Sequence, residues 1–112
     1  MRIAIPVAAG KLAAHFGHCE EFALIDVDSQ QKVILSKEVI GAPPHQPGLL
    51  PGWLAGHGAE VIIAGGMGVR AQQLFSQHQI QVVIGAPADI PEAVAQAFLE
   101  ESLQTGPNLC DH

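Results

Sequence analysis

The chain has 112 residues, with five Lys and Arg against eleven Asp and Glu, which gives a formal net charge of −6. This acidic balance argues against nucleic acid as a partner, because phosphate binding needs clustered basic side chains. Hydrophobic residues make up 48% and charged residues 14%, so the chain is too apolar to be disordered, yet no apolar run reaches the ~20 residues of a membrane helix. Two cysteines are too few for a disulfide scaffold. We expect one small cytoplasmic domain over residues 1–106 and a tail over residues 107–112.

The first forty residues predict three strands. Residues 2–7 form a short apolar run, and residues 21–28 and 32–40 flank a polar turn, which is typical of a hairpin. The hairpin makes the second strand antiparallel to both the first and the third. Between the first two strands lies a loop at residues 8–20 that is rich in Gly, Ala and His.

The rest of the chain alternates between helices and strands. Helical spacing of apolar residues begins after a Pro-rich loop at 41–48, and residues 60–64 and 80–84 predict two buried strands, with a second helix between them. A final helix is expected to begin near Asp89, with a capping box to Glu92, and to continue to Gly106.

This order of elements predicts an α/β domain with a five-stranded mixed sheet. The loops at 8–20, 41–48, 65–68 and 85–89 then leave the sheet at one edge, the carboxyl ends of the first, third, fourth and fifth predicted strands. Ligands of open α/β sheets bind at that edge. We therefore looked for chemistry in those four loops.

The run His15-Phe16-Gly17-His18-Cys19 places three metal-ligating side chains within five residues. Imidazole and thiolate suit Zn, Cu, Fe and sulfide clusters far better than Mg or Ca. The alternative is an exposed loop whose histidines have no such role. Phe16 and either Leu49 or Leu50 are expected to form an apolar wall that keeps water away.

Two further candidates lie outside that run. His45 stands in a stiff Pro-Pro-His-Gln-Pro segment, which lowers the entropy cost of holding one side chain, although a lone loop histidine is also typical of an ordinary surface. Cys110 and His112 offer a thiol and an imidazole in the tail. A final helix of about 15 residues would carry the tail roughly 22 Å from the ligand edge, so we expect the tail to stay disordered until it meets a partner.

The fourth candidate is the glycine run Gly65-Gly66-Met67-Gly68, followed by Arg70 in the first turn of a helix. Glycines let the backbone approach a ligand, and the amides at a helix start favour an anion. Met67 adds a thioether that suits Cu(I). The alternative is a tight turn that needs glycine for packing.

Several segments together resemble one family: MRIAIPV, HFGHCEEF, PPHQPGLLPGWLAGHGAEVIIAGGMGVRAQQLF and TGPNLCDH. They are similar to the dinitrogenase iron–molybdenum cofactor biosynthesis (NifB/NifX-like) domain over essentially the whole chain. The resemblance implies a three-layer α/β/α, ribonuclease H-like fold. It also implies a metal–sulfur cluster (Fe–S, Fe–Mo or Mo–Cu sulfide) held by a carrier or scaffold rather than a catalyst. Orange proteins, a close branch, hold a molybdenum–copper sulfide cluster non-covalently.

Carried onto this sequence, the resemblance points to His15, His18, Cys19, His45 and Met67 around a pocket, with Cys110 and His112 as weaker candidates. We expect a non-catalytic protein that assembles, stores or delivers a cluster to an acceptor, an ATPase or a redox partner, and a homodimer stays open. Two rivals remain. One is a regulatory or enzymatic domain that binds an anionic metabolite at the glycine run, and the other is a metal-free interaction module.

Overall fold

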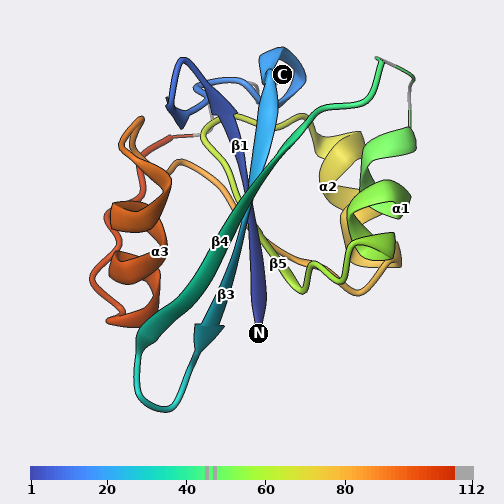
Figure 1. Ribbon diagram of the computed structural model, residues 1–112. Helices are drawn as coiled ribbons and strands as arrows, with labels where there is room; N and C mark the ends of the chain where they lie inside the picture. Colours follow the sequence, from blue (N-terminus) through green and yellow to red (C-terminus); the bar gives the residue numbers. More distant parts are fainter. Residues whose placement is uncertain (45, 47, 108–112) are drawn as a thin grey trace.

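The computed structural model describes residues 1–44, 46 and 48–107, which form a mixed sheet with helices on both faces (Figure 1). One helix, α3, covers one face, and the other two cover the opposite face, so the elements form three layers. The bounds of the strands and helices are β1 (Arg2–Ala8), β2 (Lys11–Leu12), β3 (Glu21–Asp28), β4 (Val33–Gly41), α1 (Leu49–Gly56), β5 (Val61–Ile63), α2 (Val69–Gln77), β6 (Gln81–Val83) and α3 (Pro91–Leu99). A short 3-10 helix, η1, spans Phe16–His18.

The sheet has the strand order β4-β3-β1-β5-β6, with β2 paired to β1 alone. β3 is antiparallel to β1 and β4, whereas β5 is parallel to β1 and β6. These directions confirm the predicted α/β class, the mixed sheet and its antiparallel second long strand. The structure has six strands rather than five because the chain reverses at Ala9 and Gly10, both at positive φ, and two residues of the predicted loop pair back onto β1.

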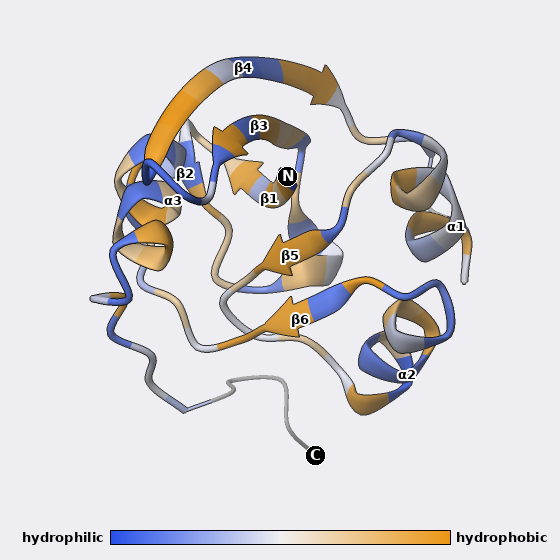
Figure 2. Ribbon diagram, turned by 90° about the horizontal axis from the view of Figure 1, so that it is seen from below, coloured by the Kyte–Doolittle hydropathy of each residue, from blue (hydrophilic) through white to orange (hydrophobic). Residues whose placement is uncertain are grey.

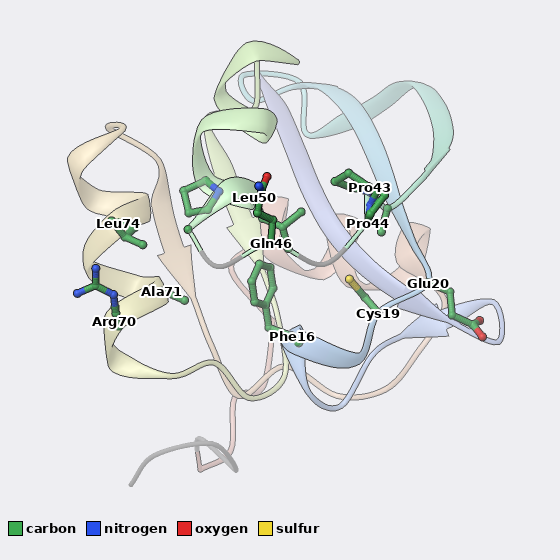
Figure 3. A pocket seen from close by; sticks show the side chains of 14 residues that line it. Phe16, Cys19, Glu20, Pro43, Pro44, Gln46, Leu50, Arg70, Ala71 and Leu74 are labelled. Carbon is green, nitrogen blue, oxygen red and sulfur yellow. The ribbon is translucent and has the colours of Figure 1, made fainter.

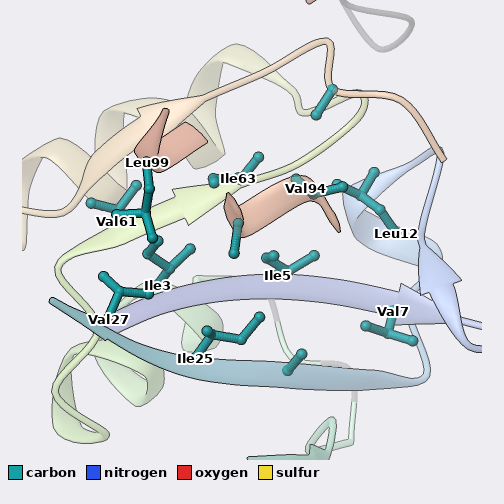
Figure 4. Close-up of a cluster of buried hydrophobic side chains, with 13 residues drawn as sticks. Ile3, Ile5, Val7, Leu12, Ile25, Val27, Val61, Ile63, Val94 and Leu99 are labelled. Carbon is teal, nitrogen blue, oxygen red and sulfur yellow. The ribbon is translucent and has the colours of Figure 1, made fainter. Parts of the chain in front are cut away.

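Two apolar cores lie on the two faces of the sheet. Figure 4 shows the core under α3, where alternate side chains of β1 and β3 meet Val94 and Leu99 of the helix. The second core lies under α1 and α2 and contains Phe22, Leu54 and Phe75. Hydropathy colouring shows β5 as a continuous apolar segment in the middle of the sheet (Figure 2), as its sequence predicts. In the described part of the chain, no helix is long and apolar enough to cross a membrane.

Helix α3 is shorter than predicted. It ends at Leu99, and Glu101 takes a left-handed conformation with φ of 59°. The amide of Glu101 donates to the Phe98 carbonyl and the amide of Ser102 to the Ala97 carbonyl, which is the hydrogen-bond pattern of a Schellman motif. Glutamate stands where glycine usually marks such an end, so the sequence signal was missing.

The start of α3 also differs from the prediction. Its N-cap is Ile90, with no side-chain capping bond. Asp89 accepts a hydrogen bond from the amide of Ile90 at 2.8 Å, and Glu92 pairs with Lys37 of β4 at 3.1 Å. The predicted capping box does not form, because Glu92 is used to tie the helix to the sheet.

Candidate functional site

The histidine loop, residues 13–20, is fastened to the glycine run at the carboxyl edge of the sheet. Backbone of His15 and Gly66 forms a parallel bridge. The amide of Phe16 donates to the Gly66 carbonyl at 2.8 Å, and the amide of Gly66 donates to the Ala14 carbonyl at 2.6 Å. The histidine loop is thereby held as an extension of the sheet beside β5.

Gly65 shows why glycine is needed at this point. A Cβ on Gly65 would lie 2.7 Å from the Ala14 carbonyl oxygen, closer than real Cβ atoms come. The close backbone approach predicted for the glycine run is therefore an approach to the histidine loop of the same chain. The Gly66 amide donates to the Ala14 carbonyl, so this amide is used within the chain, as the packing alternative for the glycine run requires.

Met67, Gly68 and Arg70 separate into different environments. The Met67 side chain is fully buried in the core under α1 and α2, and its carbonyl accepts a hydrogen bond from Gln72. Gly68 is the exposed N-cap of α2. Arg70 is exposed in the first turn of that helix. Of these three, Arg70 alone lines a pocket at this edge of the sheet.

That pocket, the main cavity, has a volume of about 450 Å³ and opens at the same edge (Figure 3). Its size falls within the range of roughly 300–1,000 Å³ typical of ligand sites. The histidine loop, the loop after β4 and the starts of α1 and α2 form its walls. The lining residues are Phe16, Gly17, Cys19, Glu20, Ala42, Pro43, Pro44, Gln46, Gly48, Leu50, Pro51, Arg70, Ala71 and Leu74.

The Cys19 thiol and the Arg70 guanidinium line the main cavity from different sides. Figure 3 shows the Phe16 ring in the middle, with the Cys19 sulfur on one side of it and the Arg70 guanidinium on the other. Cys19 is half-buried, and burial raises the pKa of its thiol. The thiol is therefore neutral near pH 7, and coordinating a metal would require it to lose a proton.

His15 and His18 are brought together, and neither of them lines the main cavity. Their ring centroids are 5.8 Å apart, with His18 exposed and His15 half-buried. Among the residues that the structure describes, no group of three or more His, Cys, Asp or Glu side chains is placed to hold a metal ion. The histidines therefore form a pair, and Cys19 lies apart from them on the cavity side.

Sequence reasoning found some cavity residues and missed others. It proposed Phe16 and Leu50 as an apolar wall, and both line the cavity. It did not identify Ala71 or Leu74 of α2, although the apolar face of that helix was a usable signal. His45, Cys110 and His112 lie outside the described residues.

Known proteins share the sequence pattern and the fold of this chain. The family described as dinitrogenase iron-molybdenum cofactor matches residues 1–101. An uncharacterized protein of Methanocaldococcus jannaschii is 31% identical over 109 residues, which cover 93% of this chain and 90% of the relative. The crystal structure of PH0822 shares 30% identity with a TM-score of 0.86 and covers 94% of both chains. The apo orange protein of Desulfovibrio gigas, at 23% identity, shares the fold, with a TM-score of 0.71 over 96% of this chain and 93% of that one.

Proposed function

Because this chain belongs to the dinitrogenase iron-molybdenum cofactor family, we propose that it binds a metal–sulfide cluster or its precursor in the main cavity. The observation that carries the proposal is the pairing of one thiol and one guanidinium across an apolar pocket. Cys19 supplies a soft ligand, and Arg70 supplies positive charge. Thiometallate clusters are anionic and soft, so they match both groups.

The apolar lining supports the same cargo. Phe16, Leu50 and Leu74 contribute carbon surface around the cavity, and Pro43 and Pro44 stiffen the loop after β4. Walls of this kind exclude water from the sulfides and strengthen the attraction between the cluster and Arg70, because the local dielectric constant falls. A cluster that brings its own sulfide ligands needs few ligands from the protein.

His45 is the sequence candidate that we keep in this site. Its sequence neighbours Pro44 and Gln46 both line the main cavity, which supports keeping His45 as a proposed ligand, although His45 itself lies outside the described residues. Together with Cys19 it would give the cavity two metal ligands. We take the Gly65–Gly68 run as the support that fixes the histidine loop, and Met67 as a core residue.

The role that fits this site is carriage rather than catalysis. The protein would hold a cluster in iron–molybdenum cofactor-related assembly and release it to an acceptor, an ATPase or a redox partner. A reducing cytoplasm would keep Cys19 and Cys110 as thiols ready to bind metal. We also infer a ribonuclease H-like arrangement of the three layers, supported by β3, which is antiparallel to both of its neighbours.

Reconstitution without oxygen tests the proposal, with ferrous iron plus sulfide in one arm and thiomolybdate plus copper in the other. We expect Cys19→Ser to weaken binding at least 10-fold, the size typical of losing a supporting group at a metal site. Arg70→Gln should weaken it roughly two- to five-fold, the size typical of losing a solvent-exposed charge pair. Lys37→Gln removes the same charge from β4, where Lys37 pairs with Glu92, and should change nothing. Wild-type binding by both cavity variants would refute the proposal.

A further inference from the structure

β4 is a long edge strand whose outer side is open. It stands first in the order β4-β3-β1-β5-β6, and its strand partner in the described chain is β3 alone. Its nine residues extend for about 31 Å at ~3.4 Å per residue, close to the 36 Å of the longest dimension of the molecule. Figure 2 shows β4 as the outermost strand of the sheet. The backbone groups that face away from β3 therefore form a long row with which another strand can pair.

Half of the exposed large apolar side chains of the described chain lie on this strand. Leu35 is 65% exposed, Val39 45% and Val33 42%. Single exposed apolar residues are ordinary on a protein surface, but several on one long edge strand favour pairing with another chain. This concentration indicates that β4 has a partner.

The devices that usually keep edge strands apart are weak here. Proline, free lysine and bulges serve this purpose in natural sheets. β4 contains no proline, and its central Lys37 is held 3.1 Å from Glu92 of α3, so this charge is already paired. The register with β3 skips Leu35, a bulge near the start of the strand that leaves residues 36–41 regularly paired. Most of the edge is therefore straight, with its central charge compensated.

The sequence of β4 is almost symmetric in polarity about its centre. Three apolar residues at 33–35 precede three polar residues at 36–38, and two further apolar residues and a glycine follow at 39–41. Figure 2 shows this pattern as orange near both ends of β4 with a blue segment between them. A strand of this kind matches a second copy of itself when the two copies run antiparallel.

A two-fold axis at Lys37 gives that match residue by residue. Two antiparallel copies would place Leu35 opposite Val39 twice and Ser36 opposite Glu38 twice. Apolar side chains then meet apolar side chains, and no carboxylate faces another across the pair. The two copies of Lys37 lie opposite each other at the axis, where each keeps its own ion pair with α3. The same strand thus supplies both halves of a closed, self-complementary interface.

We propose that β4 pairs with β4 of a second copy of this chain, antiparallel about Lys37, and that the resulting dimer has one continuous sheet. The main cavity begins just after the end of β4, where Ala42 and Pro43 line it. Antiparallel pairing places the two cavities at opposite ends of the paired strands. The dimer therefore needs no bound cluster, and it can fail without the failure of cluster binding.

Sedimentation equilibrium of the full chain over a dilution series tests the dimer. We expect the mass of a dimer at high concentration and of a monomer on dilution. Leu35→Lys combined with Val39→Lys should weaken dimerisation at least about 10-fold, because apolar contacts are lost and charges meet across the axis. Both residues are exposed, so the melting temperature and cluster binding should not change. Ile90→Lys, 48% exposed at the start of α3, is the matched control and should dimerise normally.

Two results of that experiment would overturn the proposal. One is a wild-type chain that stays monomeric throughout the series. The other is an equal loss of dimer in the β4 variant and in Ile90→Lys.

Cross-linking tests the register in a chain that also carries Cys19→Ser and Cys110→Ser. A mixture of Leu35→Cys and Val39→Cys chains should form a mixed disulfide on mild oxidation, because residues directly opposite in antiparallel strands have Cβ atoms ~4.5–5.5 Å apart. In either variant alone the two thiols would lie about 13 Å apart along the strands, so covalent dimers should be scarce. Equal yields from the mixture and from the single variants would contradict pairing about Lys37.

Discussion

The two faces of the sheet end differently at the same edge. Under α3, Leu103 of the return segment (residues 102–107) extends the apolar core, and the Gly106 amide of the same segment donates to the Gly85 carbonyl. Under α1 and α2, the core stops below Phe16, and the main cavity begins there. On one face the protein's own backbone meets at the Gly85–Gly106 contact, and on the other face the main cavity begins. Affinity for cargo and stability of the fold are therefore expected to lie in different residues.

The largest effect should come from the core beneath the cavity. Phe75 is fully buried and meets the Phe16 ring edge-on, with centroids 5.5 Å apart. Phe75→Ala should lower the free energy of unfolding by about 3–5 kcal/mol, as large-to-small core changes do. Its neighbour Leu74 is only half-buried and faces the cavity, so Leu74→Ala should cost about 1 kcal/mol while weakening cluster binding. Urea unfolding measures both free energies. Equal losses in the two variants would contradict the assignment of Phe75 to the core and Leu74 to the cavity wall.

On the face of the sheet under α3, replacing Gly85 should lower the free energy of unfolding. Gly85→Ala places a Cβ against the Gly106 carbonyl at positive φ, and we expect a loss of about 1–3 kcal/mol. Gly58 has φ of 82° with nothing within 4 Å of its would-be Cβ, so Gly58→Ala reports the conformational cost alone, about 1 kcal/mol. The difference between the unfolding free energies lost in the two variants measures how much the contact with the return segment stabilises the fold. Identical unfolding curves would mean that this segment adds nothing to stability.

Cys19 gives a smaller, pH-dependent signal on the face under α1 and α2. Because burial raises the pKa of its thiol, alkylation of Cys19 in a Cys110→Ser background should reach half its maximal rate at a higher pH than in the urea-unfolded chain. The raised pKa also means that the stabilising contribution of the neutral thiol is fully present below the unfolded pKa and is lost as pH rises through the folded one. Mass spectrometry follows the reaction. A folded-state midpoint at or below the unfolded one would contradict burial by the cavity wall.

The smallest effect should come from the ion pair that ties α3 to β4. The Glu92 pKa is lowered first by a hydrogen bond from its own backbone and then by Lys37. Its contribution is present above the unfolded pKa and lost as pH falls through the folded one. Both side chains are over a third exposed or close to it, so Glu92→Gln should cost under about 1 kcal/mol at pH 7 and nothing at pH 3. Urea unfolding of both proteins at pH 7 and pH 3 measures this loss of unfolding free energy. An equal loss at both pH values would mean that the ion pair between Glu92 and Lys37 does not stabilise the fold.

The fold was predictable where periodicity and turn residues agree. The apolar run of β5 and the polar turn between β3 and β4 placed the strands within a residue or two. The end of α3 was not predictable, because Glu101 occupies a left-handed position with no glycine to mark it. That single turn reversed the expected course of residues 102–107, which return as far as the Gly85 carbonyl.

The candidate site was predictable in residue type but not in direction. Side-chain chemistry singled out His15, His18 and Cys19, yet of these three residues in and beside η1 only Cys19 lines the main cavity. Short 3-10 turns depend on tertiary contacts, here the bridge between His15 and Gly66. The same bridge explains why glycine appears in the run that resembled an anion site.

That bridge also fixes when the histidine pair is assembled during synthesis. His15 leaves the ribosome among the first residues, but the backbone that holds its loop, Gly65 and Gly66, follows some fifty residues later. A nascent chain shorter than this has its β1–β3–β4 segment and no support for the loop. Since domains fold as units during synthesis, the histidine loop can take its folded position only once β5 has paired with β1. The two histidines are translated early, but their arrangement forms late.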